Sequence, residues 1–171
     1  MTVLSIQSNV SYGYVGNSVA IPTLQSLGHD AWHIHTVNFS NHPGHGDFSG
    51  EYSSRQKIDE NLQMLANLGG LKNCSAVLSG YLGKASNAKA ILGAVKLVKS
   101  INRKAVYLLD PVMGDDNKLF VKRGVPKAIQ NDLLRISDFL IPNKSELGCL
   151  TGTRVDSFTA LVSAANQLLH R

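Results

Sequence analysis

The sequence has little of what several protein classes require. Its two cysteines, Cys74 and Cys149, lie far apart and form no Cys-x-x-Cys pattern, so neither a disulfide scaffold nor a redox pair is indicated. No apolar run reaches the ~20 residues of a membrane span. The first residues lack the basic and small-residue pattern of a signal peptide, so we expect a cytoplasmic protein with no membrane partner.

Aromatic residues are also scarce, at 6% of the chain, and they do not alternate with the basic residues. The basic residues, which give a net charge of +5, therefore do not form the basic and aromatic surface typical of nucleic-acid binding. Anionic small substrates or a solvated basic surface explain the charge better. With 43% hydrophobic and 17% charged residues, the composition fits one globular domain over residues 1–171.

Short β-rich runs alternate with helical stretches along the chain. This alternation, with continuous apolar strands, predicts a mostly parallel sheet between helical layers, a three-layer αβα fold. Residues 38–52, rich in glycine and polar side chains, are predicted to be a long loop, and Asp156 is a candidate N-cap of the last helix. Strands are predicted at 2–7, 31–37, 76–78, 105–109 and 139–141, and helices at 17–27, 55–68, 85–101, 125–134, 144–150 and 156–170.

Polar residues follow each predicted strand. In open α/β sheets, ligands bind beyond the carboxyl ends of the strands, so these residues form one candidate rim. Among them, Asp110 emerges from an apolar strand and Glu146 lies on the first turn of a helix. Two such carboxylates can hold Mg²⁺ directly or through water. They can equally cap a turn and stabilise a helix N-terminus, and the sequence alone leaves both interpretations open.

Two other motif types carry less weight. The turn that contains Gly13 and Gly16 lacks the lysine of a phosphate-binding P-loop, so we interpret it as a tight turn. His33 and His35 lie two apart on a strand, with His42 and His45 further on. This spacing allows a zinc site and hence a zinc hydrolase, but packing in the core or at the rim explains strand histidines better.

At this rim the sequence resembles the bacterial pyridoxal kinases of the ribokinase-like superfamily, in order and over essentially the whole chain. The last two of the matching blocks occur across vitamin kinases, whereas the first three indicate pyridoxal kinases. The blocks are SIQS at 5–8 with YGYVGN at 12–17, NFSNH at 38–42, LSGYLG at 78–83, DPVMG at 110–114, and PN at 142–143 with EL at 146–147.

The resemblance implies transfer of the ATP γ-phosphate to the 5′-hydroxymethyl group of pyridoxal, pyridoxine or pyridoxamine. It implies ATP and Mg²⁺, with a monovalent cation as a further candidate, and a homodimer. Pro43 departs from the family pattern because it offers neither a hydroxyl nor an N–H. The implied substrate contacts are Ser8, Pro43, Gly44 and Tyr81, the nucleotide contacts are Asp110, Ile141, Asn143 and Glu146, and the metal ligands are Asp110, Asp115 and Glu146.

The resemblance covers only the N-terminal part of the family fold, so we expect a ribokinase-like domain that is incomplete at its C-terminal end. In the family, a later Gly-x-Gly-Asp segment supplies an anion hole and the catalytic base, and residues 152–171 contain no such segment. We therefore assign no catalytic residue and expect the chain alone to be inactive or nearly so. The alternatives are a non-catalytic fragment that binds B6 vitamers or dimerises, and a related hydroxymethylpyrimidine kinase.

Overall fold

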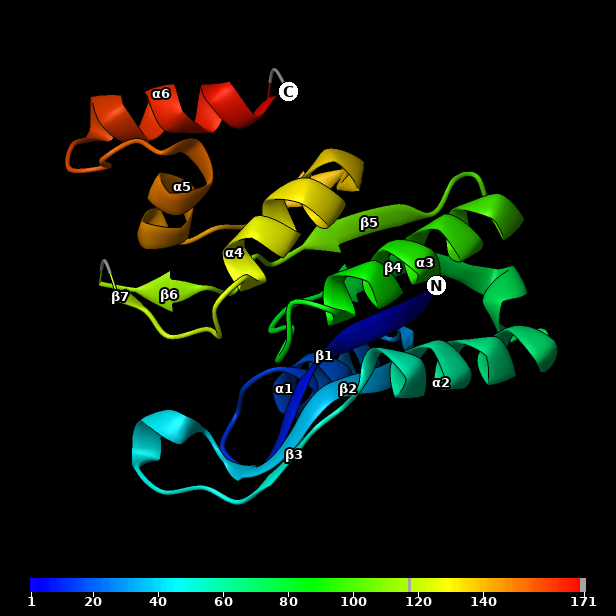
Figure 1. The fold of residues 1–171 in the computed structure, drawn as a ribbon. Helices are drawn as coiled ribbons and strands as arrows, with labels where there is room; N and C mark the ends of the chain where they lie inside the picture. The colour runs from blue at the N-terminus through cyan, green and yellow to red at the C-terminus, as the bar shows by residue number, and fades with distance from the viewer. Residues whose placement is uncertain (117, 170–171) are drawn as a thin grey trace.

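The computed structural model describes residues 1–116 and 118–169. Their elements alternate between strand and helix for most of the chain, as the sequence predicts (Figure 1). In chain order they are β1 (Thr2–Tyr12), α1 (Asn17–Ser26), β2 (Asp30–Asn41), η1 (Pro43–His45), β3 (Gly50–Tyr52), α2 (Arg55–Asn67), η2 (Gly70–Asn73), β4 (Cys74–Ser79), α3 (Asn87–Ile101), β5 (Val106–Leu109), β6 (Gly114–Asp115), β7 (Lys118–Leu119), α4 (Val125–Ala128), η3 (Ile129–Leu133), η4 (Leu134–Ile136), β8 (Phe139–Leu140), α5 (Lys144–Thr151) and α6 (Phe158–Leu169).

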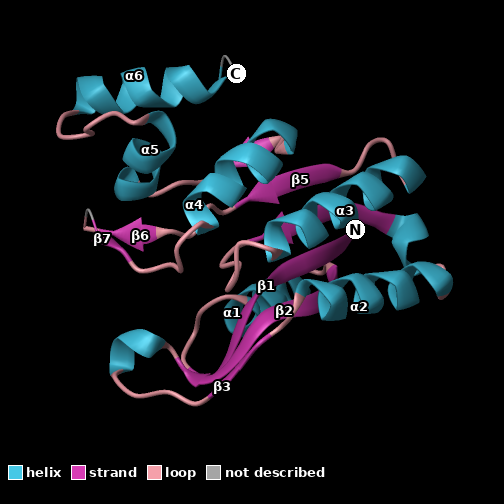
Figure 2. Cartoon of the chain, viewed as in Figure 1, coloured by secondary structure: helices cyan, strands magenta, loops and turns pink. Residues whose placement is uncertain are grey.

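A six-stranded sheet organises these elements, in the order β3-β2-β1-β4-β5-β8. Every neighbouring pair is parallel except β2 and β3. Helices α2 and α3 lie on one face of the sheet and α1 on the other, while α5 and α6 lie beyond its β8 side (Figures 1 and 2). The predicted mostly parallel sheet between helical layers is therefore confirmed.

The main core lies between the sheet and the α2–α3 layer. Leu4 and Ile6 of β1 pack there against helix residues such as Ile58 and Ile91, all fully buried. Burial of several such side chains, each worth about 1.5–3 kcal/mol, fixes the alternation of β1. The side chains between them point to the α1 face, and one of these, Ser5, is buried and polar.

The α1 face of the sheet is less completely covered than the core face. Helix α1 contacts β1 and β2, whereas an apolar row crosses the other half of the sheet. In that row Leu78 pairs with Leu108, which pairs with Phe139. The first two are half-buried and Phe139 is 56% exposed. Strands of parallel sheets are normally buried on both faces, so this row is open apolar surface.

Several predicted boundaries are wrong in one region. The prediction ends β1 at Gln7, but β1 continues to Tyr12 past a register shift between Gln7 and Asn9. The predicted loop 38–52 holds at 42–49 but not at its two ends, because β2 continues to Asn41 and β3 returns antiparallel to it, with Val37 opposite Tyr52. The polar composition of this segment hid both strands, although the β2 extension pairs with the distant β1, where Asn9 lies opposite Asn38.

Other departures are local. The helix predicted at 125–134 is continuous but irregular, passing from α4 through a π-helical turn to a 3-10 turn. The last helix begins at Phe158, and Ser157 rather than Asp156 caps it, since the Ser157 hydroxyl accepts from the Ala160 N–H at 3.1 Å. His170, the predicted end of this helix, lies outside the described residues. None of the described helices is long and apolar enough to cross a membrane.

Candidate active site

A cavity of about 570 Å³ opens at the carboxyl ends of β1, β2, β4 and β5. Parallel strands bring these ends to one edge, so segments far apart in the sequence meet there. Five of the expected site residues line this cavity: Ser8, Pro43, Gly44, Tyr81 and Asp110. The expectation that one edge of the sheet gathers these side chains agrees with the geometry.

Ser8 and Gln7 form the floor of the cavity, and two glycines make room for them. A Cβ on Gly16 would lie 2.2 Å from the Ser8 carbonyl oxygen and 2.3 Å from its hydroxyl. A Cβ on Gly80 would lie 2.6 Å from the Gln7 side-chain oxygen. Gly16 also has φ +57°, which disfavours other residues. The tight turn proposed for Gly13–Gly16 therefore has a steric purpose.

One wall of the cavity is apolar. It consists of a small buried cluster and the side chains that pack on it, namely Val10, Val15, Val37, Phe39 and Tyr81. Burial, and then the neighbouring Tyr52 with its side-chain hydrogen bond, raises the pKa of Tyr81 to about 12. The phenol is thus neutral at physiological pH. A flat wall of this kind suits the face of an aromatic ring.

Asp110 brings negative charge into the cavity. Its burial, and then the charge of Glu146, raises its pKa to about 6. Glu146 is 4% exposed, and both its oxygens have backbone partners: Oε1 accepts from the Met113 N–H at 3.0 Å and Oε2 from the Asn143 N–H at 2.8 Å. With Asn143 it forms a capping box at the start of α5, the structural role that the sequence left open.

The remaining expected residues lie near the cavity without lining it. Asn143 donates to the Gly114 carbonyl at 2.8 Å and so holds the loop after β5. Ile141 is 54% exposed, and Asp115 is exposed on β6. Within the described ranges, no three His, Cys, Asp or Glu side chains gather in a group that could hold a metal ion. Asp110 and Glu146 thus form a pair rather than part of a triad.

The sequence predicted the polar residues at the carboxyl edge of the sheet but not the apolar side chains that line the cavity. Phe39, Val112 and Phe120 all line the cavity, and Phe120 lies between the strand predicted at 105–109 and the helix predicted at 125–134, where the sequence indicated no element. His42, weighed as a zinc ligand, lines the cavity and accepts from the Gly44 N–H at 3.1 Å. The signal available for Phe39 and His42 was their place directly after a strand.

The strand histidines are only partly in the predicted environment. His33 is exposed, so of the two positions expected, core or rim, it does not occupy the core, and its ring centroid lies 4.5 Å from that of His35 in a stacked arrangement. Burial, and then the charge of His33, lowers the pKa of the half-buried His35. The side-chain nitrogen of Asn17 lies 3.1 Å from its Nδ1. His35 therefore belongs to a polar network under α1.

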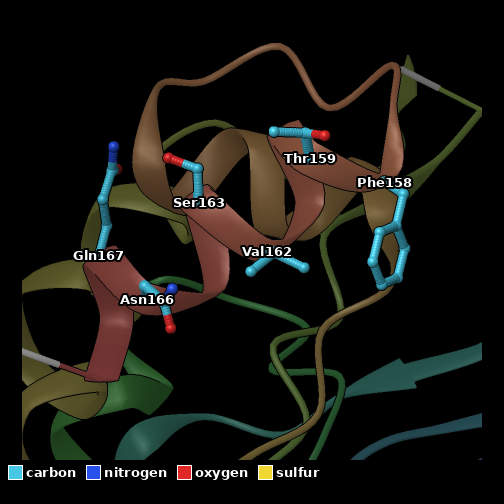
Figure 3. Close-up of a pocket in the computed structure, with 6 residues that line it drawn as sticks. All are labelled: Phe158, Thr159, Val162, Ser163, Asn166 and Gln167. Carbon is cyan, nitrogen blue, oxygen red and sulfur yellow. The ribbon is translucent and has the colours of Figure 1, made fainter.

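A second hollow lies on the outer side of α6. Figure 3 shows Phe158 and Val162 on the same side of this helix, with Ser163, Asn166 and Gln167 on the following turns. Every residue that lines it belongs to this one helix. It lacks the convergence of several strand ends that a binding site of this fold requires, so the cavity at Ser8 remains the candidate.

Comparison with known proteins gives a consistent result, although no protein-family model matches the chain. The chain is 41% identical over 170 residues to pyridoxal kinase PdxY of Rubrobacter xylanophilus, covering 99% of this chain and 59% of that protein. Pyridoxal kinase PdxY of Pseudomonas putida KT2440 gives the same values. The chain thus spans about three fifths of the length of the curated relatives it matches.

Among solved structures, the fold matches pyridoxal kinase from Leishmania donovani in complex with ADP and pyridoxamine, with a TM-score of 0.94 and 33% identity. The match covers 99% of this chain and 60% of that one. The fold is a mostly parallel sheet with flanking helices, and its structural neighbours are pyridoxal kinases of the ribokinase-like class. Within that class, the resemblance to pyridoxal kinases that the motifs indicated is confirmed, in sequence by bacterial relatives and in structure by the Leishmania enzyme.

Proposed function

We propose that the chain is the vitamin- and nucleotide-binding part of a kinase that transfers the ATP γ-phosphate to the 5′-hydroxymethyl group of pyridoxal or a related B6 vitamer. The observation that carries the proposal is the single cavity where Ser8, Tyr81 and Asp110 meet. A relative with ADP and pyridoxamine bound has this fold at TM-score 0.94. The alternatives that remain are a related hydroxymethylpyrimidine kinase and a non-catalytic B6-binding fragment.

The proposed vitamin pocket lies between the apolar wall and the polar floor. The ring of the vitamer lies against Val37 and Phe39, and Ser8 hydrogen-bonds a polar atom of the ring. Tyr81 bounds the same space with its neutral phenol. Pro43 and Gly44 close the side next to η1, where Pro43 adds shape but no hydrogen bond.

The proposed nucleotide side is the Asp110–Glu146 pair. The charge of Glu146 contributes to the raised pKa of Asp110, and a divalent cation would relieve their repulsion. Mg²⁺ bound with ATP would supply charge neutralisation of the phosphates. Asp110 would hold this metal, Glu146 would act through water while it keeps the loop 110–114 in place, and Asp115 would assist. Ile141 and Asn143 lie beside the nucleotide, and a monovalent cation is a further candidate ligand.

Turnover by this chain alone is expected to be absent or very low. Phosphoryl transfer depends on positioning and on stabilising the charge of the transferring group. Residues 152–171 have no Gly-x-Gly-Asp segment. Loss of anion-hole donors costs about 10²–10³ in rate, and loss of a general base about 10²–10⁴.

We further propose a cytoplasmic homodimer, in keeping with the sequence resemblance.

Titration of the purified chain with pyridoxal tests the vitamin site. We expect saturable binding, weakened about two- to ten-fold in Ser8→Ala by loss of one hydrogen bond and unchanged in Ser163→Ala, an exposed serine on α6. Hydroxymethylpyrimidine is the competing ligand. Tighter binding of the pyrimidine would favour the alternative kinase, and binding of neither ligand would contradict the proposal.

Turnover requires a completed chain. A fusion of residues 1–171 to the remaining C-terminal segment of the Rubrobacter relative should phosphorylate pyridoxal with ATP and Mg²⁺, and Asp110→Asn should reduce that rate at least ten-fold. A folded fusion that phosphorylates no B6 vitamer would overturn the kinase assignment. Vitamer binding without turnover would favour the non-catalytic fragment.

A further inference from the structure

The cavity has two walls that come from different parts of the chain. The apolar wall described above belongs to β1, the segment after it, β2 and the segment after β4. The opposite wall is made by Val112, after β5, and Phe120, after β7. Phe120 is 58% exposed, so packing holds it only weakly. Its backbone N–H donates to the Met113 carbonyl at 3.1 Å, which ties it to its own hairpin.

A lysine two residues after Phe120 contacts a residue that packs on the apolar wall. The ammonium nitrogen of Lys122 lies 3.5 Å from the centroid of the Tyr52 ring, which is a close cation–π geometry. Tyr52 lies on β3 behind the apolar wall, with its ring 5.1 Å from that of Phe39 in an edge-to-face arrangement. It also shares a side-chain hydrogen bond with Tyr81. Lys122 therefore touches a residue that supports two wall side chains.

The backbone around Lys122 is fixed independently of this contact. Val121 packs against the main core, and the Lys122 carbonyl accepts from the Val125 N–H at 3.1 Å at the start of α4. The base of the loop is thus anchored, while Phe120 on one side of Val121 lines the cavity. The Lys122 side chain is a link from this loop to the other wall.

We propose that Lys122 is a positioning residue. Its contact with Tyr52 joins the two walls and holds Phe120 over the cavity, so that the pocket closes around an aromatic ring. This inference rests on the proposed vitamin site for its ligand, but the link between the walls can be measured without any ligand. An exposed cation–π contact shifts an equilibrium about two- to five-fold, and this sets the size of the expected effects.

Chymotrypsin cleavage after Phe120 measures the link in the ligand-free chain. We expect Lys122→Gln to be cleaved there about two- to five-fold faster than the wild type. Lys122→Arg keeps a cation, and Tyr52→Phe keeps the ring although it loses the hydroxyl, so both should be cleaved at the wild-type rate. Lys127→Gln, an exposed lysine on α4, is the matched control. Equal rates for Lys122→Gln and Lys127→Gln would overturn the proposal.

Pyridoxal titration of the same variants measures the consequence for the site. We expect the dissociation constant to rise about two- to five-fold in Lys122→Gln and to return to the wild-type value in Lys122→Arg. Faster cleavage with unchanged pyridoxal affinity would overturn the positioning role. If the wild-type chain binds no B6 vitamer, the proposed function fails, and the cleavage rates still decide whether the walls are linked.

Discussion

At the residue scale, the cavity depends on two glycines, Gly16 and Gly80, as well as on the side chains that line it. Gly16 lets the backbone pass directly over Ser8, and Gly80 does the same over Gln7. A methyl group on Gly16 would meet the Ser8 backbone, which has no room to shift, whereas one on Gly80 would first meet the Gln7 side-chain oxygen. The site therefore tolerates little change in backbone position at its floor.

Gly16→Ala should damage the pocket more than the fold. The new Cβ would meet Ser8 at 2.2 Å at a φ of +57°, so we expect the affinity for pyridoxal to fall at least ten-fold. Gly93→Ala, in α3 with nothing within 4 Å of the new methyl group, is the control and should stabilise the helix by about 0.5–1 kcal/mol. Titration and thermal melts check both, and equal pyridoxal affinity of Gly16→Ala and the wild type would contradict the prediction.

Asp110→Asn should make the fold more stable at neutral pH. Burial and Glu146 raise the Asp110 pKa from 3.8 to about 6, so the folded state binds more protons than the unfolded state between these values. The stability contributed by Asp110 is thus highest at low pH and is lost as pH rises through about 6. We expect the variant to melt a few degrees above the wild type at pH 7.5, since about 1 kcal/mol shifts Tm by ~2–4 °C at this size.

The difference in Tm should shrink towards pH 4, where the wild-type carboxyl is protonated in the folded state. Melts of Asp110→Asn and of Asp115→Asn, a control at an exposed carboxylate, across this range provide the measurement. A variant that melts below the wild type at pH 7.5 would show that Asp110 is not destabilising there.

At the scale of elements, a buried polar network joins α1 to the sheet. Asn17, at the start of α1, is 2% exposed. Its side-chain oxygen accepts from the Ser5 hydroxyl at 2.7 Å, and its nitrogen lies 3.3 Å from the carbonyls of Gln7 and Ile34. These contacts place the N-terminus of α1, and hence Gly16, over the cavity floor.

Asn17→Ala should cost stability and disturb the neighbouring floor. It leaves the buried Ser5 hydroxyl without this acceptor, and one unsatisfied buried group costs about 1–3 kcal/mol. We expect a Tm about 2–10 °C lower, measured by circular dichroism. Asn166→Ala, at an exposed asparagine on α6, should melt within about 1–2 °C of the wild type. Equal Tm values for the two variants would show that the network contributes little.

At the scale of the whole molecule, the open apolar row on the α1 face is the main departure from a closed α/β domain. It coincides with a chain that spans about three fifths of its curated relatives. Exposed apolar surface at a sheet of this kind favours association. The row ends at Phe139 on β8, whose outer edge is the last in the sheet.

Replacing Phe139 should reduce self-association without loss of folding. Phe139 is 56% exposed, and threonine retains β propensity, so Phe139→Thr removes apolar surface while keeping the strand. Analytical ultracentrifugation should show less concentration-dependent association than for Leu68→Thr, a control at an exposed leucine beyond α2. In a separate fluorescence measurement, Phe139→Thr should also bind less of a hydrophobic dye than this control. Unchanged association of Phe139→Thr would contradict this role for the open row.

The sequence by itself determined the class of fold and the edge at which the candidate site lies. Apolar runs such as 76–78 and 105–109 predict strands of a parallel sheet, and the residues that follow such strands meet at its carboxyl edge. The family motifs added the expectation that Ser8, Tyr81 and Asp110 belong to one site. These features depend on the local hydrophobic pattern and on strand direction, both of which can be predicted from the sequence.

Only the tertiary structure decided the long-range contacts. The two ends of the polar 38–52 segment became strands, because the end of β2 pairs with the distant β1 and β3 pairs back on β2. Both oxygens of Glu146 turned to backbone N–H groups, one of them from Met113. Lys122 came to lie over the Tyr52 ring, although the two residues are 70 positions apart in the chain. Each outcome depends on which groups lie within a few ångströms after folding, and spacing along the chain does not carry that information.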